Sequence, residues 1–261
     1  MKKSLRIGRL LLPGAVLMSS CVAVYVPTTP STPLLEKGQV EVTAGLRSLH
    51  YGEVNAAWSP APHLLLTAET AFDLDNIMPE DTDINTHRDT HRQGGVGIGV
   101  YGHPGAKQSY LALTGGIGWG HSNFFASDDY QAASVFFPLP VPTRQGVYDA
   151  SYRRYFGQLY IASPEADKGP RIGGSLRAVW LDYTRLTYAD QPIVTTSRAF
   201  LEPSFFVRFG KGPLRFYFSG GLSLPLSSDR ANPADGRTAS KSYLFGGGVI
   251  LRPDLLRHHD H

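Results

Sequence analysis

Two histidines flanking an aspartate are the residues of this chain whose types and spacing come nearest to a metal site. His87, Asp89 and His91 follow a polar stretch that also contains Asp73, Asp75, Asp81 and Asp83. Imidazole nitrogens and carboxylate oxygens can together hold a divalent cation. The spacing would serve that purpose on a helix, but the stretch shows no helical periodicity. We therefore interpret it as a solvated polar loop and predict no metal ion and no cofactor.

Glycine-rich runs and a histidine tract are the other patterns that can carry chemistry. The runs at 95–99 and 115–118 would bind phosphate only if a helix followed them, and neither is followed by one. We interpret these glycines as strand residues beside aromatic side chains. His258, His259 and His261 form a terminal tract typical of a disordered tail. No nucleophile can be placed beside a base, so we predict no catalytic residue and do not expect an enzyme.

The N-terminus has the layout of a cleaved secretory signal. A basic stretch, residues 2–9, precedes a short apolar stretch, residues 10–18, and two serines precede Cys21, the single cysteine of the chain. Met18-Ser19-Ser20-Cys21 resembles the lipobox of bacterial lipoproteins, in which the cysteine becomes the new N-terminus and carries acyl chains. The resemblance implies that residues 1–20 are a signal peptide and that Cys21 carries lipid such as palmitate.

Removal of the leader changes the charge balance. The whole chain has 25 Lys and Arg against 22 Asp and Glu, and four of the basic residues lie in residues 1–20, which leaves a formal net charge of −1. The electrostatic argument for a nucleic-acid partner therefore disappears. Residues 21–37 contain Pro27, Pro30 and Pro33 among Thr and Ser. We expect them to form an extended tether that holds the next domain off its membrane anchor.

Apolar and polar residues alternate along most of the chain from Gln39 onward. In residues 40–47 the even positions are apolar, while the odd positions include Glu41, Thr43 and Arg47. About ten such segments, each roughly 8 to 14 residues long, recur between residues 38 and 252 and predict strands with two different faces. The 28 glycines, the abundant Tyr and Phe and the low charged fraction of 18% are also typical of short strands and tight turns. The sequence predicts an all-β domain.

The connections between the predicted strands alternate between short and long. Short ones cover residues 59–63, 103–107, 164–170 and 210–213, and long ones cover residues 73–93, 120–151, 187–198 and 225–240. Over residues 38–252 the chain resembles the small outer-membrane β-barrels of Gram-negative bacteria, which have tight periplasmic turns and long extracellular loops. The resemblance implies an antiparallel up-and-down transmembrane β-barrel in the bacterial outer membrane. Both ends would be periplasmic, with the anchor at Cys21 in the inner leaflet and residues 253–261 as a polar His-rich tail.

Charged residues occupy the polar face of the predicted strands, which a membrane barrel turns toward its lumen. Buried charges must be paired or solvated, and the equal numbers of both signs therefore predict a mixed network of ion pairs. A ten-stranded lumen is only a little wider than one that side chains fill, so we predict a plugged barrel of low conductance. The predicted network consists of Glu41, Arg47, Glu53, Glu69, Asp73, Arg154, Arg177, Glu202, Arg208 and Arg215.

Aromatic residues gather in the long connection at 120–151, where prolines also occur. Exposed aromatics of this kind can mark a surface that recognises an extracellular ligand or protein. Alternatively, the connection folds over the mouth of the barrel and buries them as a lid. The candidate recognition residues are Phe124, Phe125, Tyr130, Phe136 and Phe137.

These observations together favour an outer-membrane β-barrel lipoprotein with a structural or binding role. Its expected partners are the lipids of the outer membrane and an unidentified extracellular ligand or protein. One alternative is a hydrolase at the barrel rim, because ten-stranded outer-membrane proteases place His and acidic groups there. The other is a soluble, lipocalin-like periplasmic lipoprotein that carries a small ligand. A tight cluster of His and acidic groups at the rim would favour the hydrolase, whereas dispersed pairs in the lumen would favour the structural protein.

Overall fold

Ten long strands arise from the alternating segments. The computed structural model describes residues 25–47, 50–74, 90–104, 109–127, 145–164, 169–194, 197–226 and 242–256. The barrel strands are β1 (Val40–Arg47), β2 (Tyr51–Trp58), β3 (Leu64–Asp73), β4 (Thr90–Gly102), β5 (Tyr110–Ser127), β6 (Gln145–Ala162), β7 (Arg171–Tyr188), β9 (Arg198–Phe209), β10 (Leu214–Pro225) and β11 (Ser242–Leu251).

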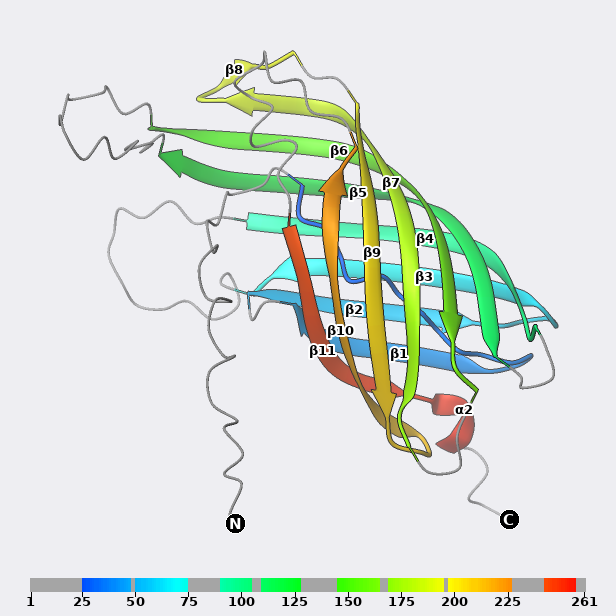
Figure 1. The fold of residues 1–261 in the computed structure, drawn as a ribbon. Helices are drawn as coiled ribbons and strands as arrows, with labels where there is room; N and C mark the ends of the chain where they lie inside the picture. Colours follow the sequence, from blue (N-terminus) through cyan, green and yellow to red (C-terminus); the bar gives the residue numbers. More distant parts are fainter. Residues whose placement is uncertain are drawn as a thin grey trace, which may run out of the picture.

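Antiparallel pairing between successive strands closes the sheet into a barrel (Figure 1). β1 pairs with β2 on one side and with β11 on the other, and β6 pairs with β7. Every long strand therefore has two neighbours, which satisfies the backbone groups that an open sheet edge would leave unpaired. The predicted all-β, up-and-down barrel of about ten strands is confirmed. A two-residue strand, β8 (Gln191–Pro192), pairs only with the end of β7.

The two faces of the wall are arranged opposite to those of a soluble barrel. On β4, the outward side chains of Val96, Ile98 and Val100 are each more than half exposed. The inward face carries buried polar and charged side chains, among them Arg154 and Arg177. The strands of a soluble barrel would turn their apolar residues toward the interior. The exposed apolar belt and the polar lumen are therefore properties of the fold itself.

The two ends of the barrel differ in the length of their connections. At one end, which we call the short-turn rim, strands are joined by residues 59–63, 103–109, 163–170 and 210–213. At the other end, the long-loop rim, they are joined by residues 48–50, 74–89, 128–144, 189–197 and 226–241. This is the predicted alternation, except that residues 48–50 form a short connection and that strands extend into the predicted long connections, most of all into the third one, residues 128–144.

That third connection is shorter than predicted because β5 and β6 each reach 18 residues. Residues 120–127 and 145–151 were expected in the loop, but they continue the strands. Beyond Trp119 the outward positions carry His121 and Asn123 in place of apolar residues. The alternation of apolar and polar residues is lost there although the strand continues. A prediction from periodicity alone therefore ends these strands where the apolar belt ends on the side of the long-loop rim.

Inward glycines on β5 make room for large side chains from β6. A Cβ atom at Gly120 would lie 2.2 Å from the ring of Tyr152, and one at Gly116 would lie 2.5 Å from the ring of Phe156. Both rings are buried in the lumen. The glycine-rich runs are thus part of β4 and β5, and Gly97 and Gly116 lie beside the ring of Phe156.

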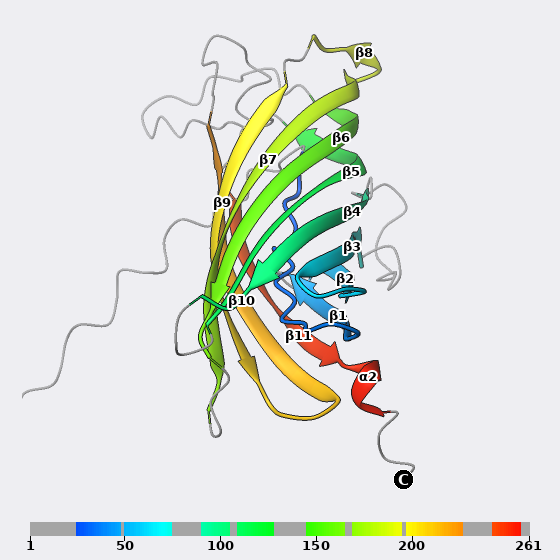
Figure 2. The ribbon, with the colours of Figure 1, turned by 90° about the vertical axis from the view of Figure 1, so that its right-hand side faces the viewer.

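The N-terminal segment Tyr25–Leu35, which we call the plug, runs inside the barrel (Figure 2). Tyr25, Thr28, Thr29, Thr32, Leu34 and Leu35 are all buried. The expectation that residues 21–37 form a tether outside the barrel is therefore wrong for the plug. The segment is extended, as its prolines predict, but its polar contacts are with the lumen wall.

The last described residues lie at the short-turn rim, where the backbone N–H of Arg252 donates to the carbonyl of Pro213. After β11, residues Pro253–Leu256 form a single helical turn, α2, and the rest of the predicted tail lies outside the described residues. In the part of the chain that the structure describes, no helix is long and apolar enough to cross a membrane.

Candidate functional site

The lumen wall binds the backbone of the plug through a row of side-chain donors. Near the long-loop rim, Gln93 Nε2 donates to the carbonyl of Val26 at 2.8 Å. Deeper in the lumen, Arg177 Nη2 donates to the carbonyl of Thr28 at 2.5 Å. The backbone N–H of Thr29 donates to Glu53 Oε1 at 3.0 Å. These contacts fix the upper half of the plug to opposite sides of the barrel.

Toward the short-turn rim the row continues with other donors. The carbonyl of Ser31 accepts from Gln158 at 2.7 Å, that of Thr32 from Arg208 at 2.5 Å, and that of Pro33 from the hydroxyl of Tyr160 at 2.7 Å. The hydroxyl of Tyr110 then donates to the carbonyl of Leu35 at 3.2 Å. Six plug carbonyls in all are bound by wall side chains.

The composition of the plug matches this donor-rich wall. Pro27, Pro30 and Pro33 have no N–H group, so the plug offers more acceptors than donors. A guanidinium has five N–H donors and no acceptor, and it therefore complements such a segment. Sequence reasoning treated the same prolines as the mark of a linker.

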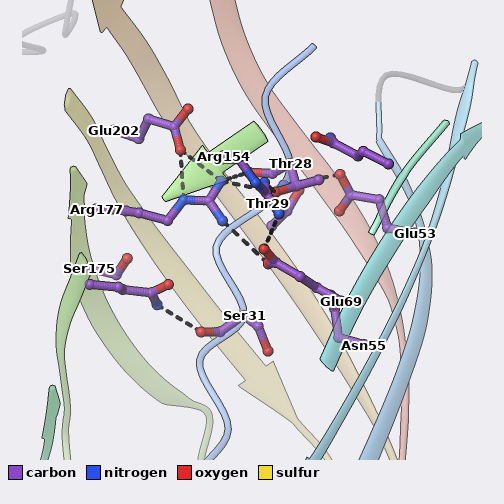
Figure 3. Close-up of polar contacts among 12 residues, drawn as sticks. Thr28, Thr29, Ser31, Glu53, Asn55, Glu69, Arg154, Ser175, Arg177 and Glu202 are labelled. Atoms are coloured by element: carbon purple, nitrogen blue, oxygen red, sulfur yellow. Dashed lines mark hydrogen bonds and ion pairs between the residues drawn. The ribbon is translucent and has the colours of Figure 1, made fainter. Parts of the chain in front are cut away.

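A charge cluster at the centre of the lumen joins four strands, β3, β6, β7 and β9, to the plug (Figure 3). Arg177, which is fully buried, contacts Glu202 at 2.7 Å and Glu69 at 3.5 Å. Arg154 forms an ion pair with the same Glu69. Both guanidinium groups also donate to Thr28 Oγ1 at 3.0 Å. Thr28 of the plug therefore lies at the point where the two arginines meet.

Other members of the predicted network lie nearer the two rims. Arg208 binds Glu41 through two hydrogen bonds of 2.8 and 3.0 Å. Arg47 Nε lies 3.3 Å from Glu53 Oε1, and the guanidinium carbon is 4.4 Å from the centre of the Tyr51 ring.

The last two predicted network members lie at the ends of their strands. Asp73 is buried at the end of β3, next to the long-loop rim. Arg215 is half-buried at the short-turn rim, where its Nε donates to the carbonyl of Gly212 at 3.2 Å. The charge network thus extends along the lumen from one rim to the other.

One hollow beside the plug is small. A hollow between the plug and the wall, lined in part by Thr32, Thr43, Asn55 and Tyr217, measures about 20 Å³. A volume of that size holds about one water molecule. This part of the lumen therefore has no room for a small organic ligand while the plug is in place.

A polar cluster on the outer wall near the long-loop rim contains a serine, a histidine and an aspartate. His121 Nδ1 lies 3.2 Å from Ser151 Oγ and 3.8 Å from Asp149 Oδ1, and Asp149 is 3.5 Å from Arg185. A serine hydrolase needs the hydroxyl on one imidazole nitrogen and the carboxylate on the other. Here both groups approach the same nitrogen, so the cluster does not have the geometry of a catalytic triad.

His91 of the candidate metal stretch is not in a loop. It lies on β4, is buried in the lumen, and its Nδ1 is 2.7 Å from Ser122 Oγ. His87 and Asp89 lie outside the described residues. Within the described ranges, no group of three or more His, Cys, Asp or Glu side chains could hold a metal ion.

The candidate recognition residues are only partly described. Phe124 was expected in a loop, but it is an inward residue of β5, only 4% exposed and stacked on Tyr148 at 5.1 Å between ring centres. The prediction that Phe124 belongs to an exposed recognition surface is therefore wrong. Because β5 continues past the apolar belt, this ring is buried inside the barrel. Phe125 is also part of β5. Tyr130, Phe136 and Phe137 lie outside the described residues, as do Cys21 and the leader.

The residues that follow the plug are bound at the short-turn rim, where the backbone N–H of Val40 donates to Asp254 Oδ1 at 3.4 Å. Gly38 N donates to the carbonyl of Ser59 at 2.6 Å, and Glu36 Oε1 is 2.7 Å from His103 Nε2. Asp254 of α2 accepts from Arg252 at 2.9 Å. Burial alone would raise the pKa of Asp254, but the hydrogen bonds and charge of Arg252 outweigh it and lower that pKa below its ordinary value.

Several neutral residues of the site were missed at the level of sequence. Gln93, Gln158, Tyr110 and Tyr160 all bind plug carbonyls, yet only charged residues were assigned to the predicted network of the lumen. Their inward position follows from the same period of two that placed Arg154. Including every hydrogen-bond donor on the polar face, neutral as well as charged, would therefore have identified these residues as facing the lumen.

No protein-family model matches the chain, and no curated protein matches it. Among solved structures, it is similar to the outer membrane protease OmpT from Escherichia coli, with 9% sequence identity and a TM-score of 0.41. The match covers 82% of this chain and 93% of that one. The function has to be inferred from the geometry of this chain.

Proposed function

We propose that the protein is an outer-membrane β-barrel lipoprotein whose lumen is closed by its own N-terminal segment. Its role is structural or binding, exerted through the long-loop rim toward an extracellular partner. The observation that carries the proposal is the combination of an exposed apolar belt outside with a plugged, charged lumen inside. Transport through an open pore is not part of this function.

The outer wall supports a position in a lipid bilayer. Trp119 and Trp180 are each about half exposed near the upper limit of the belt, and Trp58 is 48% exposed at the short-turn rim. Aromatic residues border the apolar band of membrane barrels at both interfaces. Exposing this much apolar surface to water would be unfavourable, whereas in a bilayer the lipid chains would cover it.

The lumen supports a plugged barrel over a carrier. A lipocalin-like protein keeps an apolar cavity for its ligand, but this lumen contains paired charges and the plug. The six bound carbonyls make the plug a ligand of the wall. Because the charges pair with one another along the lumen from one rim to the other, and do not gather at the rim, they also favour the structural protein over the rim hydrolase.

Planar-bilayer recording tests this proposal directly. Purified complete protein is expected to give no large, steady open-channel currents, because the plug and the charge network occupy the lumen. The same protein, when folded, should be recovered with the outer-membrane fraction of cells. Large stable currents from the complete chain, or recovery in the soluble periplasmic fraction, would contradict the proposal.

Acylation of Cys21 is the second part of the proposal. It is supported by the leader and by the absence of another cysteine in the sequence. Growth with labelled palmitate should label the complete chain, and Cys21→Ser should abolish the label. Ser20→Ala keeps the cysteine and serves as the matched control that retains the label. Persistent labelling of the Cys21→Ser variant would exclude this site.

A further inference from the structure

The plug has a direction, and its first residues lie near the long-loop rim. Tyr25 packs against Phe200, the third residue of β9, with 5.0 Å between ring centres. The hydroxyl of Tyr25 donates to Glu202 at 3.1 Å. Val26 is bound by Gln93, the fourth residue of β4. Both β4 and β9 begin at the long-loop rim, so the plug begins there too.

The last residues of the plug lie at the opposite end. Leu35 exchanges two hydrogen bonds with Tyr110, the first residue of β5, which begins at the short-turn rim. Gly38 then binds Ser59 in the turn between β2 and β3. From Tyr25 to Gly38 the chain therefore passes through the lumen from the long-loop rim to the short-turn rim, where β1 begins (Figure 2).

We infer that the chain before Tyr25 leaves the barrel on the cell surface, and that the lipid anchor proposed at Cys21 is held in the outer leaflet. This inference rests on the proposed function, which places the long-loop rim outside the cell. Four residues span at most about 14 Å, so Cys21 cannot return from Tyr25 to the periplasmic face. The lumen-spanning plug would have to be withdrawn first.

The inference replaces the expectation drawn from strand number. An even number of strands returns both ends of the barrel domain to the periplasmic side, and β1 and β11 agree with this. That rule places Val40, but it does not place residues that precede the barrel. Because the plug passes back through the lumen, the anchor lies on the side opposite to the first strand.

Native lysines make the inference testable with little perturbation. Lys241 lies in the long connection before β11, whereas Lys37 is exposed at the short-turn rim. Val24→Lys adds one amine just before the plug. Intact cells expressing this variant are treated with an amine reagent that does not cross membranes, and the labelled peptides are identified by mass spectrometry. The expected result is labelling of positions 24 and 241 and none of Lys37.

Each other outcome overturns a distinct statement. Labelling of Lys241 without position 24, followed by labelling of position 24 after the outer membrane is permeabilised, would overturn the surface exit and leave the proposed function intact. Labelling of Lys37 on intact cells would overturn the proposed orientation of the barrel, and the inference with it. An eight-residue epitope inserted after Ala23, probed with antibody on intact cells, provides a second reading. Its control is the same epitope at Ala106, in a short turn, which should bind antibody only after permeabilisation.

Discussion

Replacing Arg177 with methionine is expected to lower the free energy of unfolding by about 3–5 kcal/mol. The guanidinium is fully buried and contacts Glu202, Glu69 and the carbonyl of Thr28. Methionine fills similar space but leaves the Glu202 carboxylate without its cationic partner. Urea unfolding of the protein in lipid vesicles, followed by tryptophan fluorescence, measures the change.

Two further variants separate the lost ion pair from a general loss of packing. Arg185→Met removes an exposed arginine, 3.5 Å from Asp149, and should cost less than about 1 kcal/mol. Adding Glu202→Gln to Arg177→Met removes the unpaired charge, so the double variant should be more stable than Arg177→Met alone. A double variant less stable than Arg177→Met would show that the cost does not come from the unpaired carboxylate.

The strands and their inner face could be predicted because period-two alternation records the difference between lipid-facing and lumen-facing positions. Glu41 and Arg208 fall on the same face of distant segments, and they form an ion pair across the lumen. Alternation stops carrying information once a strand leaves the apolar belt. For that reason the extension of β5 through Phe124, and the burial of that ring, could not be predicted from periodicity.

The plug could not be predicted because its partners are not local. A Pro- and Thr-rich segment has no apolar periodicity, and the same composition is typical of linkers. Its place in the lumen depends on carbonyl oxygens that meet donors such as Arg177 and Arg208, which follow it by more than 140 residues. The equal numbers of acidic and basic lumen residues also made the network look complete without a further ligand.

Removing the plug is expected to convert a barrel that conducts no ions into an ion channel. A chain that lacks residues 26–35 keeps all ten strands and the leader, but it loses the segment that fills the lumen. Water would then replace the plug carbonyls as the hydrogen-bond partner of Arg177 and Arg208. The barrel is therefore expected to stay folded with a polar, water-filled lumen. Planar bilayers should show discrete open-channel steps for this variant where the complete chain gives none.

The control for plug removal is a deletion of equal length in a long connection, residues 128–137, which should leave the lumen closed. Wall side chains bind plug carbonyls one by one, so a synthetic peptide of residues 25–37 should reduce the current of the plugless barrel. The plug begins at the long-loop rim, so the bound peptide should also lie with its first residue, Tyr25, toward that rim. A plugless barrel that folds, as judged by slower migration after heating on a denaturing gel, and yet stays silent would mean that wall side chains alone close the lumen. The plug would then be bound in the lumen without being the element that seals it.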